Sequence, residues 1–299
     1  MSNYLSHKDG LWILFDNLDK GWSTRGISRE DLVIIRTLLD ASRKIERQFG
    51  RNDFECHSVI FIRNDVLELL LEETPDHGKE TRVNLDWSEQ DLLIEVLRKR
   101  FVYNNLEESA SIHEIWNSFC TPTISGKSSL EYFLDRSLMR PRFLLSLFNH
   151  ARGFAVNRRH NVIEEEDIRS GLSAYSGDLL VDISLELRDV FPVGENLPYV
   201  FIGSPPELLR SNIEKLITQF GFNDINADKA IEILLWHSVL GVKRSDGAIT
   251  YIHTENYDMR RLKMLIRNSE FTEPMFAIHP AFWPSLDVAV ESSQIGFHF

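Results

Sequence analysis

Near its N-terminus the chain alternates short, wholly apolar runs with segments of helical spacing. Residues 11–15 read Leu-Trp-Ile-Leu-Phe, and residues 58–62 carry a second apolar run. Between them, residues 29–49 place apolar side chains on one helical face, and Gly50 follows as a stop. Short apolar runs suit strands buried on both faces, and a helix between two strands is the βαβ pattern. We therefore expect parallel strands, with a further helix over residues 66–73 and a third strand over residues 82–87.

The middle of the chain has a different pattern and is expected to be helical. Apolar spacing predicts helices over residues 89–101, 111–119, 130–136, 140–157, 164–175 and 178–190. The sequence Phe-Pro-Val-Gly at residues 191–194 ends this region. Helices over residues 206–220 and 227–238 follow, and then two strands joined through Asp246-Gly247, a hairpin signal. Two helices followed by a hairpin are the pattern of a winged helix.

These patterns together predict the fold class and the domains. We expect an α/β fold: a core of parallel strands with helices, then an α-helical domain, then a C-terminal winged-helix-like α+β domain. The expected domains are residues 1–88, 89–190 and 191–299, and 299 residues are enough for about two domains or more.

Charge and cysteine content narrow the class of protein. The formal net charge is -12, which disfavours sequence-independent binding of nucleic acid, because such binding depends on Lys and Arg. Cys56 and Cys120 are too few for a disulfide framework and have no metal-ligand spacing. No apolar run approaches the ~20 residues that cross a bilayer. We expect a cytoplasmic protein that does not enter a membrane.

The first apolar run ends in Asp16, which gives the Walker B pattern. A carboxylate at the carboxyl end of a parallel strand can hold Mg²⁺ beside a phosphate. The alternative is a plain buried strand that ends in a polar turn. The second run ends in Arg63 and Asn64, whose side chains can donate hydrogen bonds to a phosphate oxygen. The alternative there is a strand-end turn with a surface salt bridge.

Two arginines flank the start of the helix predicted from residue 140. Pro141 is tolerated in the first turn, and Arg140 and Arg142 stand on either side of it. In a nucleotide-binding protein they reach from a lid toward the phosphates. The alternative is a basic helix start whose arginines face solvent or pair with acids.

Taken together, residues 13–22, 59–66, 73–80, 140–142 and 278–282 resemble a family of bacterial P-loop ATPases related to AAA and STAND proteins. The resemblance implies that residues 1–88 are a partial P-loop NTPase core and that residues 89–190 are its α-helical lid. It implies ATP and Mg²⁺ as cofactors. It implies that Asp16 organises the metal, that Arg63 with Asn64 is the sensor, and that Arg140 or Arg142 is the lid arginine. It also implies an oligomer or switch that couples nucleotide state to a partner or to DNA.

Two departures from that family pattern affect the expected activity. Asn17 stands where the family has an acid that orients the attacking water, and an amide is no general base. Asp19 is two residues further on and is the available substitute. Only about ten residues precede the Walker B strand, so no Walker A loop fits before it. The Gly-Lys-Ser at residues 126–128 lies on the wrong side and is a decoy.

The leading hypothesis is the C-terminal module of such an ATPase, a nucleotide-linked switch that is not catalytic alone. Its partner is then a second copy or a missing N-terminal ATPase half. The alternative is a non-enzymatic module that binds protein or DNA through the winged helix on a degenerate ATPase scaffold. A transcription regulator is a third reading, which the acidic charge disfavours.

Overall fold

The computed structural model describes residues 7–18, 26–72, 83, 85, 87–103, 111–223, 225–269 and 271–289. The chain divides into two compact units. One comprises Met1–Val83 with Glu186–Pro192, and the other comprises Asn84–Leu185 with Val193–Phe299. The predicted division into three domains stays a prediction.

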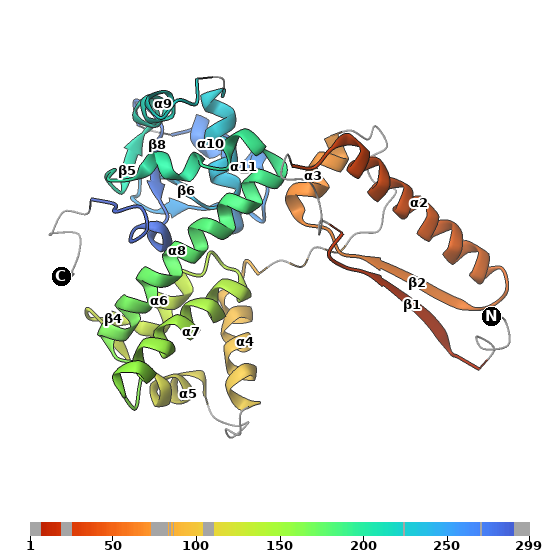
Figure 1. Cartoon of the computed structure of the whole chain (residues 1–299), viewed down its shortest axis with the longest axis horizontal. Helices are drawn as coiled ribbons and strands as arrows, with labels where there is room; N and C mark the ends of the chain where they lie inside the picture. The colour runs from red at the N-terminus through yellow and green to blue at the C-terminus, as the bar shows by residue number, and fades with distance from the viewer. Residues whose placement is uncertain are drawn as a thin grey trace. The chain divides into compact units, whose positions relative to one another are not determined.

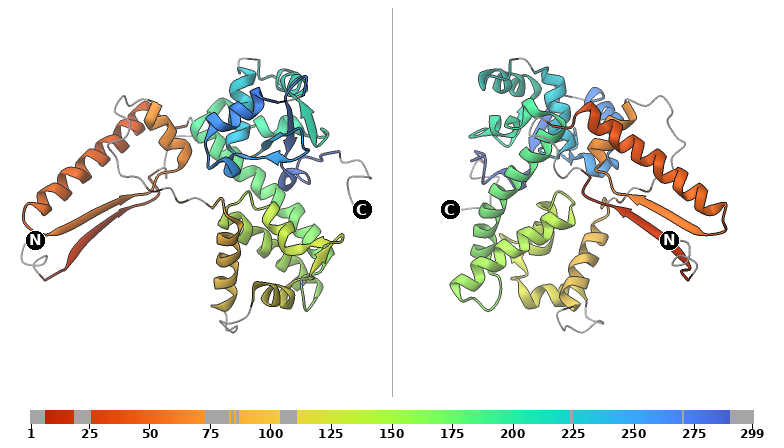
Figure 2. Two further views of the ribbon diagram at one scale, coloured as in Figure 1. Left: turned by 180° about the vertical axis from the view of Figure 1, so that it is seen from behind. Right: turned by 45° about the vertical axis from the view of Figure 1, so that its right-hand side comes forward.

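The N-terminal unit pairs two strands in parallel. Its elements are β1 (Gly10–Phe15), α2 (Arg29–Gly50), β2 (Glu55–Ile60) and α3 (Asn64–Glu72). The register runs from Gly10 opposite Glu55 to Phe15 opposite Ile60. Both views in Figure 2 show β1 and β2 side by side with α2 running along them, as in Figure 1. The predicted strand–helix–strand order is therefore present.

Helix α2 forms where the sequence supplies both a cap and an apolar stripe. Ser28 and Asp31 make a reciprocal capping box, which satisfies two N–H groups that the helix leaves unpaired. Behind this cap a small apolar core joins α2 to α3, and its buried members are Leu32, Ile35, Val66 and Leu70.

The outer face of β1 is uncovered. Trp12 is 65% exposed and Leu14 is 62% exposed, whereas their neighbours along the strand are half-buried. The expectation that this strand is buried on both faces is wrong. The reason is that α2 packs on one face of the pair, and no described element of this unit packs on the other.

The second unit begins with helices. They are α4 (Gln90–Val102), α5 (Ile112–Phe119), α6 (Ser129–Asp135), α7 (Pro141–Arg158) and α8 (Glu165–Val190), whose last turn belongs to the N-terminal unit. Figure 1 shows α4 to α7 gathered as one group. Trp116 is buried among Phe101, Phe133 and Phe148. The two helices expected over residues 164–190 are one continuous helix. A hairpin of β3 (Thr123–Ile124) and β4 (Lys127–Ser128) contains the Gly-Lys-Ser decoy.

The rest of this unit is a small α+β arrangement around an antiparallel sheet. Two short 3₁₀ helices lead in, η1 (Pro192–Gly194) and η2 (Leu197–Phe201). They are followed by β5 (Glu207–Leu209), α9 (Arg210–Gln219), α10 (Ala227–Trp236), β6 (Leu240–Lys243), β7 (Ile249–Thr250), η3 (Ile252–Glu255), α11 (Met259–Arg267), β8 (Met275–Ile278) and η4 (Pro280–Phe282). The strand order is β5-β8-β6-β7, and every pair is antiparallel.

The predicted fold class is wrong. Among the described residues the parallel sheet has two strands, the remaining sheets are small and antiparallel, and helices predominate. The expected third strand does not form at residues 83, 85 and 87, and residues 82, 84 and 86 lie outside the described part.

In the C-terminal part of the chain, the expected hairpin is present as β6 and β7. However, β8 from much later in the chain lies between β5 and β6, so two helices and a hairpin do not describe that sheet. An apolar run predicts a strand but does not determine how many neighbours that strand has.

Within the described ranges, no helix combines the length and the apolar character needed to cross a membrane.

Candidate functional site at the edge of the parallel strands

Asp16 and Arg63 lie at the same edge of the parallel pair. Phe15 and Ile60 are opposite each other at the ends of β1 and β2, and the Phe61 N–H donates to the Phe15 carbonyl oxygen at 2.9 Å. The carboxyl end of a parallel sheet is where α/β proteins usually bind ligands. The parallel register therefore brings the two predicted residues to one place.

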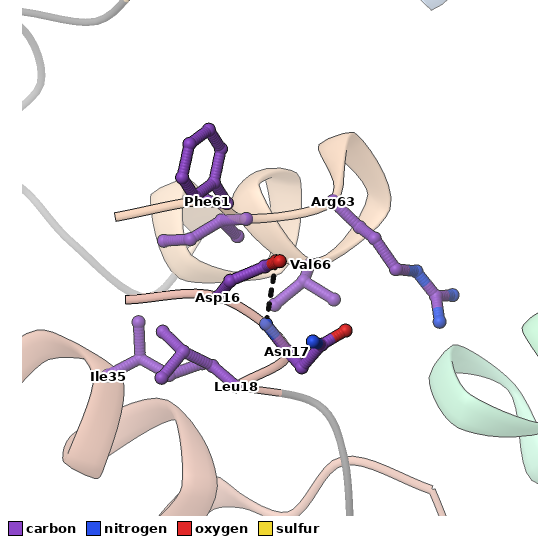
Figure 3. Close-up of a pocket in the computed structure, with 8 residues that line it drawn as sticks. Asp16, Asn17, Leu18, Ile35, Phe61, Arg63 and Val66 are labelled. Atoms are coloured by element: carbon purple, nitrogen blue, oxygen red, sulfur yellow. Dashed lines mark hydrogen bonds between the residues drawn. The ribbon is translucent and has the colours of Figure 1, made fainter. Parts of the chain in front are cut away.

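A hollow of about 270 Å³ lies at this edge (Figure 3). Pockets for drug-sized ligands measure roughly 300–1,000 Å³, so this hollow is too small to enclose a nucleotide by itself. Its lining mixes apolar side chains from α2, α3 and the segments that follow β1 and β2 with polar groups from the same two segments: Asp16, Asn17, Leu18, Ile35, Phe61, Ile62, Arg63 and Val66.

The Asp16 carboxylate is exposed and lies at the rim of this hollow. Its Oδ1 accepts the N–H of Asn17 at 2.8 Å, and no described residue bonds its Oδ2. Asn17 has a φ of 56°, a left-handed conformation that asparagine tolerates better than most residues. The turn after β1 therefore presents a carboxylate with one unbonded oxygen to solvent.

Arg63 lines the hollow, but its guanidinium points away from Asp16 (Figure 3). Its Nε and Nη2 donate to the two carboxylate oxygens of Asp65, at 3.1 and 2.5 Å. Its Nη1 donates to Asp189 at 2.7 Å, and Nη2 is also 3.3 Å from the Glu186 carbonyl oxygen. Asp16 and Arg63 share a pocket, therefore, without contacting each other.

These contacts keep Arg63 charged. Burial by itself lowers the pKa of an arginine, but hydrogen bonds and charges from Asp65 and Asp189 outweigh burial and raise the pKa of Arg63. A guanidinium that faces two carboxylates is held firmly, since it presents several donors in a fixed fork.

The other predicted catalytic residues add little to the site. Asn64 is the first residue of α3 and its side chain is exposed. Asp19 lies outside the described residues. Among described residues, the side chains close enough to share a metal ion are His160, Glu164 and Glu166, near the start of α8, and Asp16 belongs to no such group of three. A metal ion at Asp16 would take its remaining ligands from water and phosphate, as Mg²⁺ often does.

The predicted lid arginines lie in the second unit at the start of α7. Arg140 is the N-cap residue and makes no side-chain cap, and Pro141 occupies the first turn as predicted. Arg142 donates to Asp182 at 3.3 Å. Both guanidinium groups lie over the ring of Phe143, at 5.3 and 5.0 Å from its centre. Pairing with an acid was the alternative stated for these arginines, and Arg142 fits it.

Sequence reasoning missed the two acids that hold Arg63. Asp65 directly follows Arg63 and Asn64, where a strand-end turn with a surface salt bridge was the stated alternative. Asp189 carries no local signal, because it is one of several acids on a long helix, 126 residues from Arg63. Only the tertiary structure brings this acid to the strand end.

The fold and site define a mostly helical protein with a small two-stranded parallel unit and a polar hollow at its edge. A family profile described as the FunZ-associated C-terminal helical domain matches residues 91–184, the helical part of the second unit. This match supports a helical module in place of the α/β fold predicted from the sequence.

Two known proteins are similar to the chain at low identity. The "Putative transposon gamma-delta 80.3 kDa protein" of Escherichia coli (strain K12) is 24% identical over 291 residues, which cover 92% of this chain and 40% of that protein. The "Allergen Alt a 2" of Alternaria alternata is 25% identical over 178 residues, covering 57% of this chain and 92% of that protein. No solved structure matches the chain. The chain thus spans less than half the length of the transposon protein.

Proposed function

We propose that the chain is the C-terminal module of a nucleotide-linked switch of the AAA/STAND ATPase type, the class that its sequence motifs resemble. In this proposal Asp16 holds the Mg²⁺ of a bound nucleotide, and another stretch of polypeptide supplies the loop that cradles the phosphates. The observation that carries the proposal is that Asp16 and Arg63 leave neighbouring parallel strands at one edge and line one hollow. The compartment in the proposal is the cytoplasm, where ATP is available.

The chemistry of this edge suits a metal-bound phosphate. Asp16 offers an unbonded carboxylate oxygen, which is the ligand type that Mg²⁺ prefers. Arginine suits a phosphate oxygen because its donors form a fork, and those of Arg63 are bonded to Asp65 and Asp189 in this structure. One carboxylate alone holds Mg²⁺ weakly, so the metal is expected to arrive with its nucleotide. With Asn17 in place of an acid, no hydrolysis by the isolated chain is expected.

The uncovered sheet supports the need for additional polypeptide. Parallel strands in known folds are almost always covered on both faces, and two strands alone are marginally stable. Trp12 and Leu14 leave a large apolar face open to solvent. The similar transposon protein carries this region within a much longer chain. Additional polypeptide of this kind would cover Trp12.

A titration with a fluorescent ATP analogue and Mg²⁺ tests the proposal on the full chain. We expect weak, saturable binding that EDTA abolishes. Asp16→Asn should weaken it roughly tenfold, since a hydrogen bond or metal contact to a charged group contributes about 1.5–3 kcal/mol. Asp9→Asn is the matched control, because Asp9 precedes the opposite end of the same strand. Equal affinities for the two variants, or no saturation, would overturn the proposal.

The second candidate is an interaction module without nucleotide, and the exposed face of β1 favours it. In that case the face binds protein whether or not nucleotide is present. DNA binding through α11 has less support. Arg261 and Lys263 are paired with Glu255 and Glu232, at 3.0 and 2.7 Å. The name of the transposon relative agrees with a DNA-linked role, but these ion pairs occupy two of the basic side chains of α11.

A further inference from the structure

We infer that the ion pair between Arg63 and Asp189 holds the last turn of α8 in place within the N-terminal unit, and that a phosphate-bearing ligand at the Asp16 edge breaks this ion pair. We call this ion pair the catch. The release step rests on the function proposed above, whereas the catch itself does not. The two partners in the catch are the side chain of Arg63 and the carboxylate of Asp189 on the last turn of α8.

The contact is partly buried and has defined geometry. The Arg63 side chain is 29% exposed, that of Asp189 is 23% exposed, and that of Asp65 is 9% exposed. The Nε and Nη2 of Arg63 donate to Asp65 in a bidentate contact, and the Nη1 of Arg63 donates to Asp189. Asp65 therefore orients the guanidinium, and the bond to Asp189 is the one that reaches α8.

A second set of contacts depends on the same position of α8. The N–H of Ile27 donates to the backbone oxygen of Asp189 at 2.7 Å. Gly26 has a φ of +83°, and a Cβ at that position would lie 2.6 Å from Cγ of Pro192. The chain that enters α2 thus lies directly against the end of α8. The exchange rate of the Ile27 amide hydrogen consequently reports whether the last turn of α8 is held in this position.

The charges at the catch make it responsive to an anion. One guanidinium faces two carboxylates, so these three side chains together carry a charge of about −1. A phosphate that approaches Arg63 cannot simply join them, because like charges held close together repel. It has to replace one carboxylate, and Asp189 is the more exposed of the two and is held by a single nitrogen. Loss of that bond frees the last turn of α8.

Helix α8 contributes residues to both units. It begins at Glu165 in the second unit, where its buried side chains include Ile168, Leu179 and Ile183, and it ends at Val190 in the N-terminal unit. The catch therefore acts on the end of a helix whose remaining turns are built into the core of the other unit.

Hydrogen exchange measured by mass spectrometry on the full chain tests the catch without any nucleotide. In Asp189→Asn, the peptides that contain Ile27 and residues 186–192 are expected to exchange roughly tenfold faster, because one charge-assisted bond is lost. Asp182→Asn is the matched control: it removes an acid two turns earlier on α8 that pairs with Arg142. If Asp189→Asn and Asp182→Asn leave these peptides equally protected, the catch is overturned.

The release step is tested by adding Mg²⁺ and ATP to the unaltered chain. We expect both peptides to exchange as fast as in Asp189→Asn, and the Asp189→Asn variant to show no further change. If the fluorescent analogue binds but protection stays the same, release is overturned and the nucleotide site stands. If no nucleotide binds, the proposed function and the release step are both overturned, while the nucleotide-free comparison still decides the catch.

Discussion

The Nη1 atom of Arg63 lies 2.7 Å from the Asp189 carboxylate, 126 residues further along the chain. This ion pair ties the end of a short parallel strand to the last turn of a 26-residue helix. The strand end is also where Asp16 presents its carboxylate. One arginine thus belongs both to a candidate ligand site and to a contact that holds the fold together.

The close approach beside that ion pair predicts the effect of a small substitution. Gly26→Ala would place a methyl group 2.6 Å from Cγ of Pro192 and 2.8 Å from the Asp189 carbonyl oxygen, at a φ of +83°. We expect the free energy of unfolding to fall by about 2 kcal/mol, from strain and displacement of α8. Urea unfolding followed by circular dichroism measures this.

Gly50→Ala is the control for that substitution. Gly50 is the last residue of α2, and no atom lies within 4 Å of the position its Cβ would take. We expect no loss of stability there, because alanine favours a helix over glycine. Equal losses in the two variants would contradict the close approach of residues 26 and 192.

A pair of buried histidines predicts how stability depends on pH. His253 is 7% exposed, and its Nδ1 has no hydrogen-bond partner among the described residues. Burial, and then the charge of Arg140, lower the pKa of His253 from 6.5 to about 4. Burial, and then the charges of His253 and Arg136, also lower the pKa of His279. Both side chains are therefore neutral in the folded protein at neutral pH.

The sign of the effect follows from these lowered pKa values. Below pH 6.5 the unfolded chain binds protons at His253 that the folded chain does not, so stability is complete above pH 6.5 and falls toward pH 4. His253 alone can account for up to about 3 kcal/mol of this loss. His160 opposes the trend, because its hydrogen bond to Asp167 raises its pKa and favours folding at low pH. Since His160 is at the surface, we expect the buried pair to dominate.

Urea midpoints measured from pH 7.5 to 5 check this prediction. The His253→Phe variant keeps a ring stacked beside Tyr251 and removes the proton-binding group. Its stability should fall less steeply between pH 6.5 and 5 than that of the unaltered chain. Parallel curves for the two proteins would rule out His253 as the cause.

The uncovered face of β1 predicts self-association of the isolated chain. Trp12 and Leu14 are both more than half exposed, and an exposed apolar strand face favours pairing with another copy. Analytical ultracentrifugation should show weight-average mass rising with concentration. Changing both residues to Thr, which suits a strand, should restore the monomer.

Ile34→Gln is the comparison for that pair. Ile34 is 64% exposed on α2, so the change removes apolar surface from another face of the same unit. We expect it to leave the association unchanged. If it acts as strongly as the β1 changes, association does not involve the strand face.

Local sequence signals predicted most helices within a few residues. Helix α2 begins at Arg29 as expected, because its Ser28 cap and apolar spacing are properties of consecutive residues. The parallel pairing of the first two strands and the shared edge of Asp16 and Arg63 could also be predicted, since both follow from a βαβ unit. The size of the sheet could not, because an apolar run does not specify how many strands will lie beside it.

The sequence by itself determined the approximate bounds of most helices and the polar residues that follow β1 and β2, because caps, turns and apolar spacing act over a few residues. Tertiary structure alone decided that β1 keeps an open face, that β8 joins the sheet between β5 and β6, and that Asp189 meets Arg63. These features depend on contacts between residues far apart in the chain. Such contacts form only where packing brings the segments together, and no local pattern records them.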